Sequence, residues 1–337
     1  MTPNDAPAET FSGRALSRLL GVVAGVTVIE ARSLAGLAET LLHHPSPAPG
    51  APRGESDLNS NGSPLQALFS ARKDSWVVRL IADPAFDRRD PLERLSASRE
   101  ALAATLAVSG AEALGPLAAT MLETILPSDE EALRRYPTGV LRLGVALGAP
   151  GAAVYAGADP GGSPWSSARR WAQATFDAPG EVAGVIEALA RGCSLLGTGI
   201  EGASPGHARA KIYWRLASET SLRSFGIPLF ESPDVRRFLA AILGEREVPL
   251  GALNFSAGFA VSTGKLCDIK VDVARSDLGP ADALQLVNEQ ARLFSLSPPP
   301  LHGLFDRMTE QRVGAACVGL GLDVRGGRRI NTYLYQR

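Results

Sequence analysis

Basic and phenolic residues alternate with apolar ones in a short stretch of this 337-residue sequence, residues 207–216. Side chains along a β-strand point alternately to its two faces, so this spacing predicts a strand with one polar and one apolar face. The polar face would carry His207, Arg209, Lys211, Tyr213 and Arg215. Cations packed this closely need water, anions or carboxylates beside them. The stretch therefore predicts a cationic strand face whose partners are water, anions or carboxylates.

Two later segments repeat this alternation. In residues 267–275, Asp268, Lys270 and Asp272 share one face, and the residues between them are mostly apolar. The face of residues 328–335 carries Arg329, Asn331, Tyr333 and Tyr335. These segments predict further strands whose polar faces could meet that of residues 207–216.

The rest of the chain alternates helical patterns with paired strands. An acidic cap followed by proline, Asp90-Pro91, predicts the start of a helix, and Ser163-Pro164 predicts another. Further helices are predicted at about 13–42, 111–126, 181–196, 222–230, 233–243, 280–294 and 299–310. Strand pairs are predicted at 65–70 with 76–83, 140–147 with 153–158, 253–261 with 267–275, and 315–324 with 328–335, besides the hairpin that ends in 207–216.

The recurring order of helix, strand, strand and helix predicts an α+β fold with ten antiparallel strands. Closure into a barrel would remove the two unprotected edges of so large a sheet. The helices must bury their apolar stripes on the apolar side of the sheet, so the polar faces should point into a lumen. We expect one domain over residues 13–337, with a loop at 43–63, after a flexible tail at 1–12.

The predicted lumen gathers cations, phenols and two acids. Besides the acids Asp268 and Asp272, it contains Arg79, Arg142, Tyr155, Arg209, Lys211, Tyr213, Lys270, Arg329, Tyr333 and Tyr335. Arginine and lysine neutralise negative charge and tyrosine donates hydrogen bonds, so this set suits a diphosphate. Solvated or salt-bridged strand faces would explain any single residue, but the recurrence over several hairpins favours a site.

The repeated αββα order and the Arg209-x-Lys211-x-Tyr213 triplet resemble the ABBA prenyltransferases, and the final residues 318–335 resemble their cyanobactin peptide branch most. The resemblance implies transfer of an allylic prenyl group from its diphosphate to an acceptor inside the barrel. It assigns diphosphate binding to Arg79, Arg209, Lys211, Tyr213, Lys270, Arg329 and Tyr333, with Tyr155 matching a further family tyrosine. Ala153 departs from a lysine that is frequent in the family.

The catalytic base is the least determined part of the resemblance. Gln66 stands where the family often has a glutamate, and a glutamine can orient an acceptor but cannot take a proton. Asp268 and Asp272 are the preferred catalytic candidates, with Asp83 and Glu55 as alternatives. Small residues at Gly144, Gly258 and Gly319 could make room for the prenyl chain. No motif requires a cofactor or a metal, and a role for Mg²⁺ stays open.

A peptide acceptor, cyclic and ribosomally derived, is the expected partner. The alternatives are a small indole or phenol acceptor, or a non-catalytic barrel that binds an anionic ligand. With 34 basic and 35 acidic residues the net charge is −1, which argues against nucleic acid or an anionic membrane as a partner. Three widely spaced cysteines, no signal-peptide pattern and no span-length apolar run predict a cytoplasmic protein, which we expect to be monomeric.

Overall fold

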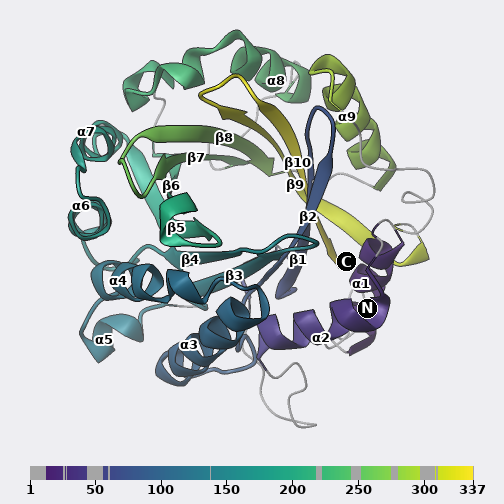
Figure 1. Ribbon diagram of the computed structural model, residues 1–337, viewed down its shortest axis with the longest axis horizontal. Coiled ribbons are helices and arrows are strands. Elements are labelled where there is room, and N and C mark those ends of the chain that lie inside the picture. Colours follow the sequence, from purple (N-terminus) through teal and green to yellow (C-terminus); the bar gives the residue numbers. More distant parts are fainter. Residues whose placement is uncertain are drawn as a thin grey trace, which may run out of the picture.

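Ten strands form a closed antiparallel barrel in the computed structural model (Figure 1), which confirms the predicted fold class. The structure describes residues 13–25, 27, 29–43, 56–59, 61–136, 138–217, 222–243, 252–274, 280–296, 308 and 310–336. The predicted tail at 1–12, the proposed base Glu55 and most of the predicted helix 299–310 lie outside these residues. The described parts of 43–63 contain no helix or strand.

Consecutive strands pair with each other, and β1 closes the barrel by pairing with both β2 and β10. The strands are β1 (Leu65–Ala71), β2 (Trp76–Ala82), β3 (Leu141–Ala146), β4 (Ala152–Gly157), β5 (Cys193–Gly202), β6 (Arg209–Leu216), β7 (Leu253–Ala260), β8 (Leu266–Ala274), β9 (Val313–Asp323) and β10 (Arg328–Gln336). Pairing all along the ring leaves no free sheet edge.

The helices surround the barrel (Figure 1). They are α1 (Gly13–Ala24), α2 (Ala31–Leu42), α3 (Pro91–Val108), α4 (Gly115–Ile125), α5 (Glu130–Leu133), α6 (Pro164–Thr175), α7 (Gly180–Leu189), α8 (Pro233–Leu243) and α9 (Pro280–Leu293). Short 3₁₀ segments are η1 (Glu112–Leu114), η2 (Pro205–His207), η3 (Leu222–Phe225) and η4 (Pro228–Glu231). As predicted, Asp90 caps α3: its Oδ1 accepts hydrogen bonds from the backbone N–H of Leu92 and Glu93 at 2.8 and 3.2 Å.

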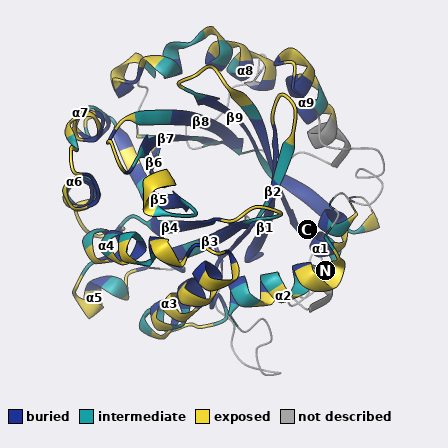
Figure 2. Cartoon of the chain, in the orientation of Figure 1, coloured by how far each residue is buried: buried dark blue, intermediate teal, exposed yellow. Residues whose placement is uncertain are grey.

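The hydrophobic core lies between the helices and the outer face of the barrel, and the helices expose their other sides (Figure 2). Trp214 on β6 is fully buried there and packs against Phe225, Phe230 and Phe255. The apolar faces of the strands therefore point outward to the helices, which leaves the polar faces for the lumen. No helix in the described part of the chain has the length and apolar character to cross a membrane.

Four predicted boundaries were wrong. The helix predicted at about 13–42 is two helices, α1 and α2. The helix predicted at 181–196 ends at Leu189, because residues from Cys193 onward pair with β6. The helix predicted at 222–230 is two 3₁₀ segments, since Gly226 adopts a positive φ of 68° and Pro228 has no N–H to continue a helix. The strand predicted from His207 begins at Arg209, and His207 lies exposed in η2.

Candidate functional site

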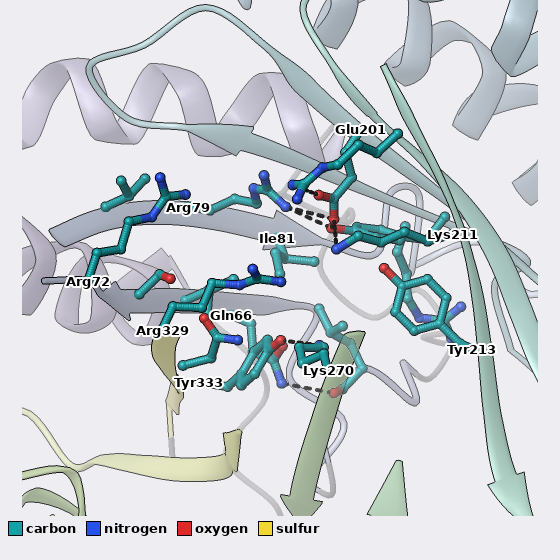
Figure 3. Close-up of a pocket in the computed structure, with 18 residues that line it drawn as sticks. Gln66, Arg72, Arg79, Ile81, Glu201, Lys211, Tyr213, Lys270, Arg329 and Tyr333 are labelled. Atoms are coloured by element: carbon teal, nitrogen blue, oxygen red, sulfur yellow. Dashed lines mark hydrogen bonds and ion pairs between the residues drawn. The ribbon is translucent and has the colours of Figure 1, made fainter. Parts of the chain in front are cut away.

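A cavity of about 210 Å³ lies inside the barrel (Figure 3). Ten of the twelve residues predicted for the site line it: Gln66, Arg79, Arg142, Tyr155, Arg209, Lys211, Tyr213, Lys270, Arg329 and Tyr333. The other two, Asp268 and Asp272, are buried beside it without lining it. Tyr335, also predicted to be lumenal, is buried on β10 opposite Gln66 and does not line the cavity. The structure thus brings together cationic side chains from five strands, β2, β3, β6, β8 and β10.

Glu201, a residue that the sequence analysis did not select, lies at the centre of the cationic cluster. Its Oε1 accepts hydrogen bonds from Tyr155 Oη at 3.0 Å and Arg79 Nη1 at 3.1 Å. The same oxygen is 3.3 Å from Lys211 Nζ, and Oε2 accepts a hydrogen bond from Arg209 Nη2 at 3.0 Å. The side chain comes from β5, and the residue is only 4% exposed. Four predicted diphosphate ligands therefore converge on one carboxylate.

The charges of this cluster hold Glu201 ionised. Burial alone would raise the pKa of the Glu201 carboxyl, but Lys211, Arg79 and Arg209 outweigh burial and keep it well below its usual range. For Lys211 the balance is reversed: burial lowers the pKa of its ammonium group to about 8, although Glu201 and Asp268 oppose that shift. Glu201 is thus a permanent anion near neutral pH, whereas Lys211 can titrate.

Asp268 holds a second group of cations in place. Its Oδ2 accepts a hydrogen bond from Arg329 Nη2 at 2.9 Å and a shorter one from Arg209 Nη1. Burial opposes the charge on Asp268, yet Lys211, Arg329 and Arg209 keep its pKa below the ordinary value. The carboxylate therefore orients two guanidinium groups from β6 and β10.

Lys270 forms a third group with phenol rings. Its Nζ donates a hydrogen bond to Tyr333 Oη at 2.6 Å and forms an ion pair with Asp272. The same nitrogen lies 5.1 Å from the ring centroid of Tyr333 and 5.8 Å from that of Tyr213. Tyr213 and Tyr155 make an edge-to-face pair with centroids 5.8 Å apart. The electron-rich faces of such rings attract a cation. This wall of the cavity could therefore stabilise positive charge on a bound molecule.

Glycines on neighbouring strands make room for these long side chains. A Cβ added at Gly321 would lie 2.5 Å from Arg329 Nε, and one at Gly199 would lie 2.8 Å from Tyr155 Cδ1. The space beside Gly144, Gly258 and Gly319, which we expected to accommodate a prenyl chain, is taken up by Arg79, Asp268 and Asp272. That expectation was wrong, because the inward glycines accommodate charged side chains of the protein itself.

Apolar side chains line the cavity as well, between and beside the cations. They are Leu58, which precedes β1, Leu68 on β1, and Val77 and Ile81 on β2. Gln66 Nε2 donates hydrogen bonds to the backbone carbonyl of Leu58 at 3.2 Å and to Asn59 Oδ1 at 2.7 Å. A carbonyl can only accept, so the atom facing Leu58 must be the amide nitrogen, which leaves Oε1 as the acceptor of the Gln66 side chain.

Two other charged groups lie at the borders of this region. Arg142 lines the cavity and forms an ion pair with Asp57. Asp83, an alternative base, is fully buried, accepts hydrogen bonds from Ser56 and Arg94 at 2.7 Å each, and does not line the cavity. The Arg142–Asp57 ion pair and the Ser56–Asp83 hydrogen bond tie residues 56–59 to the barrel.

The lumenal cations outnumber the acids that neutralise them. Apart from the Arg142–Asp57 pair, six cations line the cavity: Arg72, Arg79, Arg209, Lys211, Lys270 and Arg329. Among the described residues, three carboxylates form ion pairs with this group, namely Glu201, Asp268 and Asp272, and Asp323 also acts on Arg72. The cations therefore exceed the carboxylates, and the lumen favours a bound anion.

Arg72 is a second cation that the sequence analysis missed. It follows β1 in the turn to β2, and burial together with the nearby Arg329, Arg209 and Arg79 lowers its pKa. It was missed because residues 71–75 were assigned to a turn, without considering where that turn meets the lumen. Glu201 could have been found from hairpin register, since it pairs directly with Arg209 across β5 and β6.

Within the ranges that the structure describes, no group of three or more histidine, cysteine, aspartate or glutamate side chains is placed to hold a metal ion. The lumenal carboxylates instead bind the cations of the protein.

Comparisons with solved structures define the class of fold. The 5-dimethylallyltryptophan synthase of Streptomyces coelicolor is similar over 98% of this chain and 97% of its own, with a TM-score of 0.73 and 19% identity. The 6-dimethylallyltryptophan synthase of Micromonospora olivasterospora, solved with DMASPP and Trp, covers 96% of each chain with a TM-score of 0.73 and 17% identity. AnaPT from Neosartorya fischeri covers 96% of this chain and 92% of its own, with a TM-score of 0.68 and 11% identity.

The chain therefore has the ABBA, or PT-barrel, fold of the prenyltransferases, as the sequence resemblance implied. At these identities the likeness establishes the fold and not the reaction. The sequence matches no protein-family model and no curated protein. The resemblance to the cyanobactin branch stays a prediction.

Proposed function

We propose that this protein is an aromatic prenyltransferase that moves a dimethylallyl-type group from its diphosphate to an indole or a related small aromatic acceptor. The convergence of Arg79, Arg209, Lys211, Lys270 and Arg329 with three tyrosines in one lumen carries the proposal. Excess positive charge suits the diphosphate, and the phenol rings beside it suit an allylic cation. A non-catalytic anion-binding barrel would not need aromatic rings and apolar side chains in the same lumen as the cations.

In the proposed reaction, the bond between the allylic carbon and the diphosphate oxygen breaks, and the oxygen keeps the electron pair. The cations of the lumen stabilise the departing diphosphate, because they lie in place before the charge develops. An electron-rich aromatic carbon attacks the allylic cation and then loses its proton. Glu201, Asp268 and Asp272 are all held in ion pairs. The departing diphosphate is therefore the proton acceptor we favour, and a role for Asp268 or Asp272 as base stays a prediction.

The acceptor hypothesis now favours a small aromatic molecule over a peptide. Two of the similar structures, including that of Streptomyces coelicolor, are described in complex with DMASPP and Trp. In this chain, the carboxamide oxygen of Gln66 is available to accept a hydrogen bond from an indole N–H beside Leu58, Leu68 and Ile81. A peptide acceptor is retained as an arm of the test.

The decisive experiment is a transfer assay with mass detection. The protein would be incubated with dimethylallyl or geranyl diphosphate and, separately, with tryptophan, other indoles, naphthols and cyclic peptides. We expect the mass of one added prenyl unit on an indole. Products on peptides alone would restore the peptide hypothesis, and binding of a diphosphate without any transfer would favour the non-catalytic barrel.

Gln66 provides a test of acceptor orientation. We expect Gln66→Leu to raise the KM for the indole acceptor about two- to tenfold, because one hydrogen bond contributes roughly 0.5–1.5 kcal/mol. Affinity for the prenyl diphosphate should stay unchanged, since the amide does not contact the cationic cluster. Steady-state kinetics in each substrate would check this, with Gln285→Leu on the surface of α9 as the control. An unchanged acceptor KM would remove Gln66 from the acceptor site.

The pKa of Lys211 predicts how donor binding depends on pH. Below pH 8 the Lys211 ammonium is already charged, but above its pKa of about 8 an anion can bind it only with uptake of a proton. Affinity for dimethylallyl diphosphate should therefore fall by up to about tenfold per pH unit above this pKa. Calorimetric titration at several pH values would measure the slope. The slope should disappear in Lys211→Met, and a slope identical in both proteins would contradict the assignment.

A further inference from the structure

Glu201 has the environment that the proposed function requires for a phosphate group. Its two oxygens are bound by Arg79, Tyr155, Arg209 and Lys211, with distances of 3.0–3.3 Å (Figure 3). Each of these four side chains is a predicted ligand of the donor diphosphate. In the structure, the carboxylate of the protein itself satisfies them. The donor and Glu201 must therefore compete for the same hydrogen-bond donors.

The two anions cannot share this cluster without a cost. A diphosphate beside the ionised Glu201 would meet a like charge in a site that is largely removed from water, where Coulomb repulsion is strong. Either the carboxylate leaves its four partners or it keeps some of the cations from the donor. Both outcomes weaken donor binding compared with a barrel in which position 201 is uncharged.

The surroundings of Glu201 allow it to leave. The space beside Gly199, the next inward position on β5, is taken by the Tyr155 ring. Glu201 itself lines the cavity, however, and the residue directly across on β4 is Ala153, whose side chain is a single methyl group. The carboxylate could therefore turn away from the cations on the Ala153 side or into the cavity, without a movement of the strands.

We propose that Glu201 is an internal competitor of the donor: its carboxylate binds the side chains that would hold a phosphate group, yields them when the prenyl diphosphate binds, and returns to displace the diphosphate product. This inference rests on the proposed function. Glu201 thereby keeps the buried cations paired between turnovers and limits product inhibition, in exchange for weaker binding of the donor.

The test is calorimetric titration with inorganic diphosphate at a pH below 8, where Lys211 is charged. Glu201→Gln keeps the size of the side chain and an acceptor oxygen but removes the charge. We expect this variant to bind inorganic diphosphate at least about tenfold more tightly than the unmodified protein. In the transfer assay, added diphosphate should inhibit the variant at correspondingly lower concentrations.

The matched control is Glu187→Gln, which breaks the exposed ion pair with Arg169 outside the barrel and should leave diphosphate affinity unchanged. If Glu201→Gln fails to fold, Glu201→Asp takes its place: the shorter carboxylate cannot reach all four partners and should tighten diphosphate binding several-fold. Equal or weaker binding in the folded variant would overturn the inference alone. Absence of diphosphate binding in the unmodified protein and in the variants would overturn the proposed function as well.

Discussion

Replacing Lys211 with methionine should reduce the kcat/KM for prenyl transfer by about 10²- to 10³-fold, the usual cost of removing one preorganised donor that faces developing negative charge. The ammonium group lies in the lumen, is only 4% exposed and forms part of the cluster around Glu201. Methionine preserves most of the buried aliphatic volume, so the substitution removes the charge with little loss of packing. Transfer kinetics with saturating acceptor would measure the effect.

The fold should survive this substitution. Burial lowers the pKa of Lys211, which means that the folded protein disfavours its charged form. That unfavourable contribution is present below pH 8 and is relieved as the pH rises toward the value of an unfolded lysine, so removing the ammonium should not lower the melting temperature at neutral pH. Lys265→Met, at an exposed lysine paired with Glu181, is the control. Full transfer activity in Lys211→Met would remove this lysine from the donor site.

Trp214→Ala should have the opposite pattern: we expect it to lower the free energy of unfolding by about 3–5 kcal/mol. Trp214 is three residues away on the same strand, but it points outward, is fully buried and packs against Phe225, Phe230 and Phe255 at centroid distances of 5.4–6.1 Å. Its indole N–H has no hydrogen-bond partner in the described structure, so the loss would be one of packing.

Urea denaturation of Trp214→Ala, with Trp214→Phe as the milder variant, would measure this loss. Diphosphate affinity under conditions where the variant is folded should match that of the unmodified protein, because the indole does not contact the lumen. A stable Trp214→Ala protein with impaired diphosphate binding would show that the two faces of β6 are assigned the wrong way round.

The residues of β6 show why so much of the barrel could be predicted from sequence. A strand exposes alternate side chains to opposite faces, so the pattern from Arg209 to Leu216 assigns each residue to a side without further information. The same period placed Lys270 and Tyr333 in the lumen. Closure of the barrel could be predicted because an open sheet would leave unprotected edges. The helix cap at Asp90 could be predicted because it depends only on local hydrogen bonds.

Glu201 marks the limit of that reasoning. It was overlooked because the strand that carries it was partly assigned to a helix, and a register shift between Leu195 and Gly197 disturbs its pairing. Even a correct assignment of β5 would have shown only that Glu201 is on the inward face and pairs with Arg209. Its contact with Arg79 joins β5 to β2, two strands that are not hydrogen-bonded neighbours in the barrel.

The sequence by itself determined the strands, their polar and apolar faces, and a cationic lumen suited to a diphosphate, because these follow from local periodicity and from the burial of apolar surface. Only the tertiary structure decided which charges meet. The curvature of the closed barrel brings side chains from distant strands within hydrogen-bonding distance, and no local pattern encodes that distance. The closed barrel places the carboxylate of Glu201 among the cations. It also fills the space beside the inward glycines with charged side chains.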